Sequence, residues 1–218
     1  MALYRLAVDT LVALSRGRTS VPEILRQVNA AGVEGLAPAL LLGLLVGGVG
    51  VARATGLLAA VGSHQLANEL VVLLVRDAGP LLTALLVLVR SGASVAVDVG
   101  SAEGSPGERA LPRILGLQLS VLALYVFFAS ASLAGASLGV SIVLGTPLML
   151  PGAGLEPLDF FQSGLRCSIF AGVIGLLCSA EGMADRPLPV AARRATLGGL
   201  AACLVLEGAL GTIFGGLA

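Results

Sequence analysis

We predict an all-α membrane protein from three features of the sequence. Hydrophobic residues make up 56% of the 218 residues and charged residues only 12%, whereas soluble domains carry about 25% charged residues. The mean hydropathy is +0.98. The apolar residues gather in five long runs separated by polar stretches, and a helix of about 20 apolar residues is long enough to cross a bilayer.

The polar residues exclude several functions. All 13 basic residues are Arg and none is Lys. A Walker A loop needs its Lys to reach the nucleotide phosphates, so we expect ATP, if it is used, to be bound by another chain, and no other cofactor is indicated. The net charge is zero, so the chain lacks the excess of basic residues that is typical of a nucleic-acid-binding protein. The three cysteines have neither zinc nor disulfide spacing, so no metal site is predicted.

Residues 1–35 are predicted to form an N-terminal region of two helices. The first should be amphipathic and lie in the membrane interface. Its expected apolar face consists of Leu3, Leu6, Ala7, Leu11 and Leu14, opposite Arg5 and Asp9. Ser20 and Glu23 have the spacing of a capping box, in which each side chain bonds the backbone N–H of the other residue. A second helix should therefore begin at this point.

Residues 36–218 are predicted to form the transmembrane domain. We expect spans at about 36–53, 71–100, 111–140, 160–180 and 195–217. Segment 54–70 should form a loop and a short helix outside the bilayer, and residues 101–110 a polar loop. Pro80 should bend the second span, because proline removes a backbone hydrogen bond and clashes with the preceding turn.

The distribution of arginine predicts the orientation. Cytoplasmic loops of membrane proteins are enriched in basic residues. With the N-terminus in the cytoplasm, nine arginines fall on the inner side: Arg5, Arg16, Arg18, Arg26, Arg109, Arg113, Arg186, Arg193 and Arg194. At most Arg53 and Arg76 then fall outside. An odd number of spans places the C-terminus outside the cytoplasm.

Glycine strips predict where helices pack closely. Gly43 and Gly47 in the first span, and Gly135 and Gly139 in the third, have the G-x-x-x-G spacing that lets helix backbones approach. The same role is expected for Gly79 and Pro80. Residues 135–139 also have the form of a G-x-S-x-G nucleophile elbow, but that motif needs a strand, a turn and a His base. The one histidine, His64, is expected in a loop, so helix packing is the favoured interpretation.

Charged residues inside the second span are the strongest indication of function. An ionised group in hydrocarbon costs roughly 2.5–3.5 kcal/mol on insertion scales, and such groups normally face a protein interior or a water-filled cavity. Arg76 and Asp77 are adjacent, so on an α-helix they point about 100° apart and should find partners on other helices. Two interpretations stay open: an inter-helix salt bridge that sets the register, or the polar floor of a cavity.

Further charged residues follow later in the second span and in other spans. Arg90, Ser94 and Asp98 recur every four residues and share one helix face; Arg90 needs a partner or must snorkel to the interface. Three further charged residues lie singly in other spans: Arg53, Arg166 and Glu207. We expect the two arginines to snorkel and the glutamate to be a buried carboxylate.

The stretch RDAGPLLTALLVLVRSGASVAVDVG (76–100) resembles the R-E-L-G-P…A-L-L…R-x-G-S-A…E-x-G signature of MlaE-type permeases, the membrane subunits of MCE-type ABC lipid transporters. The positions that fall on the pattern include Arg76, Gly79, Pro80, Ala84, Leu85, Leu86, Arg90, Gly92, Ser94 and Gly100. Asp77 and Asp98 stand where the family has Glu. Weaker similarity extends over residues 20–218, through ILRQVNAAGVEGLAP (24–38), PRILG (112–116), GLRCSIFAG (164–172) and AARRAT (191–196).

This resemblance implies a transport subunit rather than an enzyme, in the inner membrane of a bacterium. It implies a dimer, formed with itself or with a related permease, that works with a cytoplasmic ABC ATPase and an external MCE-domain protein on a lipid or phospholipid substrate. The residues it places on the lipid pathway or dimer interface are Arg53, Arg76, Asp77, Arg90 and Asp98.

Two positions depart from the family. The cytoplasmic E-x-[IL]-D-A-L loop is shortened here to SAEGSPGERAL (101–111) and retains only Ala110 and Leu111. Arg53 stands where the family usually has Gln. Because the loop is shortened, an alternative stays open in which the protein is a membrane scaffold that has lost ATPase docking. A second alternative is an ion-coupled transporter that uses Asp98 or Glu207 as a relay. In such a transporter, paired charges on separate helices would be expected.

Overall fold

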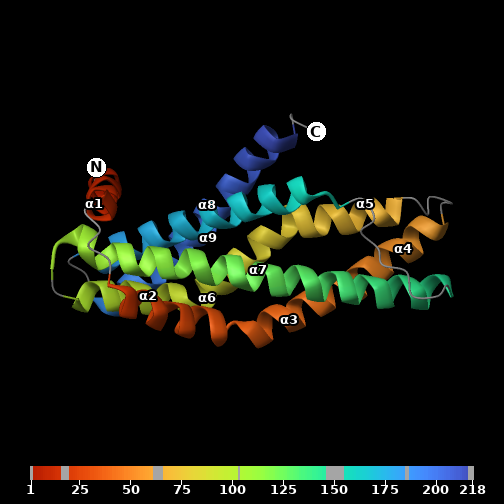
Figure 1. Ribbon diagram of the computed structural model, residues 1–218, viewed down its shortest axis with the longest axis horizontal. Coiled ribbons are helices and arrows are strands. Elements are labelled where there is room, and N and C mark those ends of the chain that lie inside the picture. The colour runs from red at the N-terminus through yellow and green to blue at the C-terminus, as the bar shows by residue number, and fades with distance from the viewer. Residues whose placement is uncertain are drawn as a thin grey trace.

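The computed structural model describes residues 2–15, 20–60, 66–102, 104–145, 155–184 and 187–215. These residues form helices, with no strand among them, which confirms the predicted all-α class. The helices lie side by side in an elongated bundle, and the last turns of the C-terminal helix project from it (Figure 1).

Five helical segments of the described chain are long and apolar enough to cross a membrane, as predicted. They are Val21–Leu58, Glu69–Ser101, Pro106–Leu144, Pro157–Gly182 and Pro189–Ile213. A further N-terminal helix, α1 (Ala2–Ser15), lies across one end of the bundle (Figure 1). The protein is therefore a multi-pass membrane protein.

The first span is built from five consecutive helical pieces. They are α2 (Val21–Val28), the π-helix η1 (Asn29–Val33), α3 (Leu36–Leu45), the π-helix η2 (Val46–Gly50) and α4 (Val51–Ala60). Helix α2 begins after Ser20, as predicted, but continues through a turn at 34–35 into the span instead of forming a separate region. The side chain of Ser20 makes no capping hydrogen bond, so the predicted capping box is not formed.

The second span consists of α5 (Leu66–Leu73), the π-helix η3 (Leu74–Ala78) and α6 (Gly79–Ser101). Helices α4 and α5 cover most of segment 54–70, which is thus more helical than predicted because the apolar, helix-compatible sequence continues past Arg53. His64 lies outside the described residues. Pro80 is the second residue of α6 and so lies in the first turn of that helix, where its missing N–H is tolerated.

The remaining spans are α7 (Pro106–Leu144), α8 (Pro157–Gly182) and α9 (Leu188–Gly215). Ser105 and Glu108 form a capping box at the start of α7, so the helix begins inside the predicted polar loop and only residues 102–105 separate it from α6. Helix α7 ends at Gly145, whose φ of 63° is the left-handed conformation that glycine adopts without strain. A second capping box, Glu156 with Asp159, starts α8.

Helix α1 packs on α7 and α8 through a face that differs from the predicted one. Leu6, Thr10 and Ala13 are buried, whereas Leu11 and Leu14 are exposed. Burial of Thr10 is possible because its hydroxyl donates to the Leu6 carbonyl oxygen at 2.7 Å. Leu11 and Leu14 therefore face outward. That this face of α1 lies in a membrane interface stays a prediction.

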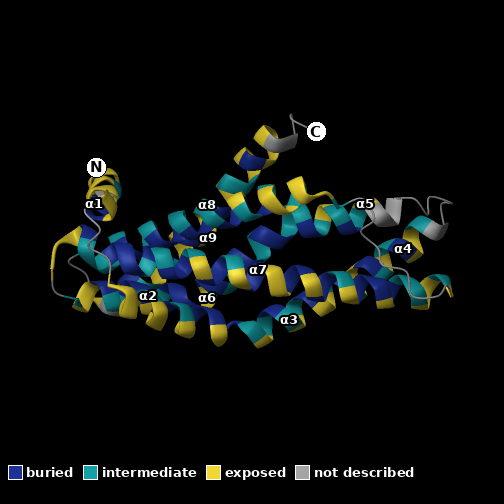
Figure 2. Ribbon diagram, viewed as in Figure 1, coloured by how far each residue is buried: buried dark blue, intermediate teal, exposed yellow. Residues whose placement is uncertain are grey.

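Apolar side chains occupy both the inside and the outside of the bundle. Helix α7 runs through the middle, against α3, α8 and α2, and the inward helix faces are buried while the outward faces are exposed (Figure 2). Exposed apolar residues include Leu41, Leu45, Val89 and Val126. Large exposed apolar surfaces mark contact with a partner or a membrane, in agreement with the five apolar spans.

The two predicted glycine strips pack the first span against the third. A Cβ at Gly43 would meet the Phe128 carbonyl oxygen at 2.6 Å, and one at Gly47 would collide with the carbonyl of Ser132. In return, Gly135 and Gly139 lie against the backbone of 44–48. The interface is therefore reciprocal, and the G-x-S-x-G sequence lies within helix α7 rather than at a strand end.

Candidate functional site

The site is organised by the π-helix η3, which interrupts the second span. The backbone N–H of Gly79 donates to the carbonyl of Leu74, five residues earlier, instead of to that of Val75, as in an α-helix. Pro80 has no N–H to donate to the carbonyl of Arg76. Both freed carbonyls accept a hydrogen bond from a side chain of another helix: the Tyr125 hydroxyl donates to Val75 O and the Ser163 hydroxyl to Arg76 O, each at 3.2 Å. The Ser163 hydroxyl also lies 2.8 Å from the carbonyl oxygen of Asp159 in its own helix.

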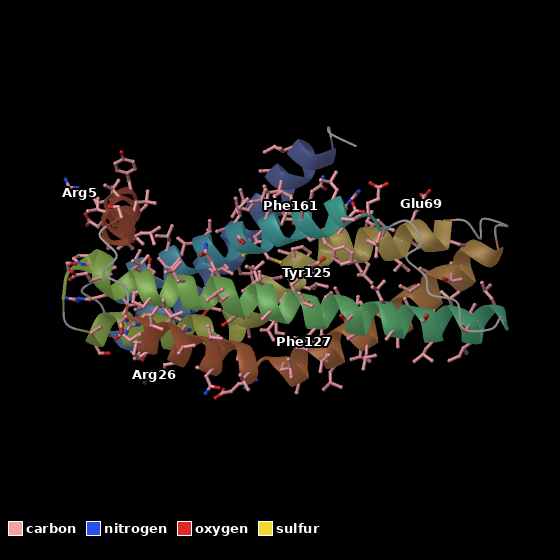
Figure 3. All side chains as sticks on the ribbon, in the orientation of Figure 1. Arg5, Arg26, Glu69, Tyr125, Phe127 and Phe161 are labelled. Carbon is pink, nitrogen blue, oxygen red and sulfur yellow. The ribbon has the colours of Figure 1, made fainter. Side chains whose placement is uncertain are left out.

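Tyr125 lies inside the bundle, whereas Phe127 points away from it, as does Phe161 on α8 (Figure 3). Phe128, the third aromatic residue of α7, is buried and apolar, so Tyr125 is the aromatic residue of this helix whose hydroxyl serves inside the bundle. A π-turn held by side chains of α7 and α8 is a defined local geometry, and such bulges occur frequently at functional sites.

The widened turn brings Arg76 and Asp77 together. The Arg76 guanidinium donates to both carboxylate oxygens of Asp77 at 3.4 Å. This differs from the expectation that neighbouring side chains diverge, because a π-helix has more residues per turn and so separates successive side chains by a smaller angle. Each residue also reaches a partner on another helix, as predicted.

Five charged side chains form a chain of alternating sign, which we call the ionic chain: Asp159, Arg76, Asp77, Arg166 and Glu207. Its successive nitrogen–oxygen distances are 3.6, 3.4, 2.6 and 3.7 Å. The members come from η3, α8 and α9. Three carboxylates and two guanidiniums leave a formal charge of −1 when all are ionised.

Arg166 is the most buried member, with a side chain only 3% exposed, while Asp77 and Glu207 are 24% and 25% exposed. The expectation that Arg166 snorkels to an interface is wrong: it points inward and donates to Asp77 at 2.6 Å. The side chain is enclosed because α8 packs against both α6 and α9. A buried charge requires paired and hydrogen-bonded neighbours, and the two carboxylates provide them.

A cavity of about 230 Å³ opens beside the ionic chain, and we call it the charged cavity. Its lining consists of Leu73, Arg76, Asp77, Gln162, Arg166, Glu207 and Gly211. Among the described residues, no group of three side chains has the composition of a metal site. The charged cavity instead offers cationic, anionic and apolar walls together, a combination suited to an amphipathic ligand.

Arg90 and Asp98 lie away from the ionic chain. Arg90 is 14 positions (90 − 76) beyond Arg76 on the same helical path, roughly 21 Å at 1.5 Å per residue. It makes an exposed ion pair with Glu34 at 3.3 Å. The backbone carbonyl of Asp98 accepts a hydrogen bond from Arg113. These contacts join the second span to the first and third, toward the α6–α7 end of the bundle.

Arg53 occupies a third location, at a groove of about 530 Å³ between the first span and the end of α7. The groove is otherwise apolar, with Leu44, Val49, Leu138, Ile142 and Val143 among its walls. The glycines Gly48, Gly135 and Gly139 line it as well, so the absence of their side chains leaves the space open. Arg53 itself is exposed.

The tertiary structure thus brings together one predicted pair and three residues from elsewhere. Arg166 and Glu207 stand out in the sequence as charges within apolar runs, and that signal is sufficient to select them but not to pair them. Asp159 precedes an apolar run, and its sequence pattern indicates a helix start rather than a site.

The described residues thus form a multi-pass, all-α membrane protein with a partly buried ionic chain beside a cavity. Residues 24–105 match the family model described as Permease MlaE, which supports an MlaE-type permease. The match covers the first two spans, including Arg53, η3 and the Arg90–Asp98 face. No curated protein is similar enough to the chain to count as a match.

Proposed function

We propose that the chain is the permease subunit of an ABC-type transporter that moves lipid between the bacterial inner membrane and an external MCE-domain protein. The observation that carries the proposal is the ionic chain, in which Arg166 is held between Asp77 and Glu207 at the wall of a cavity. Ionisable groups at such positions in membrane proteins mark substrate pathways by default. The family match to residues 24–105 supports the same function.

The two hollows have no lining residue in common, and each suits a different part of a lipid. The charged cavity can hold a polar headgroup without placing it in hydrocarbon. The apolar groove beside Arg53 can hold an acyl chain against aliphatic and glycine walls. The ion pairs between η3, α8 and α9 would keep the headgroup position constant while the helices around it move.

We further propose that ATP is bound by a separate cytoplasmic ATPase and that two permease chains associate. The described arginines of the α6–α7 end, Arg109 and Arg113, together with Arg193 and Arg194 at the start of α9, support a cytoplasmic location for that end. The N-terminus would then be cytoplasmic and the C-terminus external.

One observation favours the alternative of a non-transporting scaffold. Only residues 102–105 connect α6 to α7, so little chain is left for the family's ATPase-docking loop. In that alternative the ionic chain would serve helix register alone. The contact between Arg166 on α8 and Glu207 on α9 is the kind of pair expected of an ion-coupled transporter. That alternative is less favoured because Asp98 is far from the ionic chain along its helix, so the two carboxylates do not form one relay.

The test is purification of the tagged protein from its own membranes after mild cross-linking. We expect an ATPase, an MCE-domain protein and phospholipid to be recovered with the wild-type chain, and the phospholipid to be lost in Arg166→Gln. Arg90→Gln, which breaks an exposed pair, is the matched control and should retain the lipid. Recovery of both proteins with no lipid, or equal lipid in both variants, would favour the scaffold; recovery of neither protein would contradict the transporter.

A further inference from the structure

The two ends of the ionic chain are compensated unequally. Asp159 is satisfied on both carboxylate oxygens: Oδ1 lies 3.6 Å from Arg76 and Oδ2 accepts from the backbone N–H of Glu156 at 2.9 Å. Within the described part of the chain, the ion pair of Glu207 is the long 3.7 Å contact of its Oε1 with Arg166. Its Oε2 is buried and has no hydrogen-bond partner among the described residues.

A carboxylate oxygen in this position requires a hydrogen-bond donor. Buried polar groups in folded proteins nearly always have a partner, and leaving one unsatisfied costs about 1–3 kcal/mol, or more for a charged group. The ionic chain as a whole also carries a formal charge of −1, so it lacks one positive charge. A cation that donates a hydrogen bond beside Glu207 would supply both the missing partner and the missing positive charge.

The structure leaves room for that partner. Glu207 and Gly211 both line the charged cavity. Beyond the backbone of its own helix, a Cβ built on Gly208 or Gly211 would meet no described atom within 4 Å. One helical turn beyond Glu207 the surface is thus open. Leu73, another wall of the charged cavity, is exposed and apolar, which suits a ligand that carries its cation next to hydrocarbon.

The same cavity also presents Arg76, whose side chain is 30% exposed. An accessible guanidinium and an under-compensated carboxylate in one cavity are complementary to a ligand with an anionic and a cationic group. Guanidinium groups recognise phosphate through charge-assisted hydrogen bonds. We infer that the charged cavity takes the headgroup of a zwitterionic phospholipid, with its ammonium group at Glu207 and its phosphate at Arg76.

This inference rests on the proposed function and assigns a substrate class to its site. It is tested on the purified full-length chain in detergent micelles by native mass spectrometry. The probes are phosphatidylethanolamine, phosphatidylcholine and phosphatidylglycerol with identical acyl chains. We expect the two zwitterionic lipids to bind at least roughly tenfold more tightly than phosphatidylglycerol, the scale of one charge-assisted hydrogen bond. Phosphatidylethanolamine above phosphatidylcholine would indicate an N–H donor, and equal binding of the two would indicate charge alone; both support the inference.

Variants of α9 assign the preference to Glu207. Glu207→Gln should reduce the preference to about twofold or less, and Glu207→Asp should retain most of it. Glu34→Gln, which removes the exposed carboxylate paired with Arg90, is the control and should leave the preference unchanged. Gly211→Leu should weaken binding of the zwitterionic lipids by filling the open space, whereas Gly198→Leu, at an equally open position earlier in α9, should not. The Gly211 variant tests the site even if Glu207→Gln does not fold.

Several results would overturn the assignment. Equal binding of all three lipids by the wild-type chain, or an unchanged preference in Glu207→Gln, would remove the ammonium site while leaving the proposed function intact. Displacement of phosphatidylethanolamine by an equal concentration of soluble phosphoethanolamine would mean that the cavity takes a free headgroup rather than a lipid. If no lipid binds under any of these conditions, the proposed function itself fails, and this inference with it.

Discussion

At the scale of single residues, Asp77 is the member of the ionic chain with a cation on each side. It contacts Arg76 within its own π-turn and Arg166 across to α8, and the second contact is the shorter, at 2.6 Å against 3.4 Å. Because Arg166 is almost fully buried, its compensation depends on Asp77 more than that of Arg76 does. Single changes in the ionic chain should therefore have unequal costs.

We expect Asp77→Ala to destabilise the protein by about 3–5 kcal/mol, because it leaves a buried arginine without its closest partner. Asp77→Glu, which restores the residue that the resembling family carries, should be tolerated. Arg90→Ala is the control and should cost about 0–1 kcal/mol, since it breaks an exposed pair. Thermal unfolding in detergent measures these differences, and wild-type stability in Asp77→Ala would show that the pair is solvated.

Double changes test which contact dominates. The combination of Asp77→Ala with Arg166→Ala should be less harmful than the sum of the singles, because residues in one ionic network are not independent. The coupling should be larger for this pair than for Asp77→Ala with Arg76→Ala, in line with the two distances. Equal coupling energies in the two cycles would contradict the geometry described for Asp77.

At the scale of elements, the π-turn η3 depends on hydroxyl groups supplied by two other spans. Tyr125 and Ser163 donate to the carbonyls that the π-turn and Pro80 leave free. The glycine interface between the first and third spans depends instead on missing side chains. One element is thus positioned by added hydrogen bonds and the other by close approach, and each can be tested separately.

Tyr125→Phe and Ser163→Ala should each cost about 1–3 kcal/mol, because each removes the hydroxyl that donates to a buried or partly buried backbone carbonyl. Since both carbonyls belong to the turn that carries Arg76 and Asp77, lipid binding should fall as well. Ser130→Ala removes a similar hydroxyl-to-carbonyl bond on the exposed side of α7 and is the control, expected to change neither quantity. Stability and lipid binding measured together decide the matter: loss of stability alone would limit the two hydroxyls to a structural role.

Gly47→Leu should prevent the first span from packing on α7, because even a Cβ at this position would run into the carbonyl of Ser132. Overpacking typically costs about 1–3 kcal/mol, occasionally more. Gly50→Leu lies three residues on, with no neighbouring atom within 4 Å of its Cβ position, and should be close to neutral. Thermal unfolding of both variants checks this, and equal stability would refute the close packing.

At the scale of the whole molecule, the orientation of the bundle can be tested by cysteine labelling in intact cells. The native cysteines Cys167, Cys178 and Cys203 are all buried, so they should react little. We expect an impermeant thiol reagent to label Glu69→Cys from outside and to leave Ser101→Cys unlabelled until the membrane is opened. Both positions are exposed. The reverse pattern would invert the proposed topology.

The sequence by itself determined the class of the protein and the number of its spans. Hydropathy and charge are local properties, so five apolar runs predict five helices whatever their packing. The glycine strips and the charged start of the second span were equally readable, because close approach and the cost of buried charge follow from residue type. Helix ends such as those at Ser105 and Glu156 were less predictable, since capping depends on backbone geometry.

Only the tertiary structure decided which charges meet. Asp77 and Arg166 are 89 positions apart, and no periodicity along one helix indicates a partner on another. Packing of α8 and α9 against the second span turned Arg166 inward, whereas Arg90 and Asp98, which share a helix with the site, lie far along its axis. The site therefore depends on how the helices pack, because an ion pair depends on distance in space and not on position in the chain.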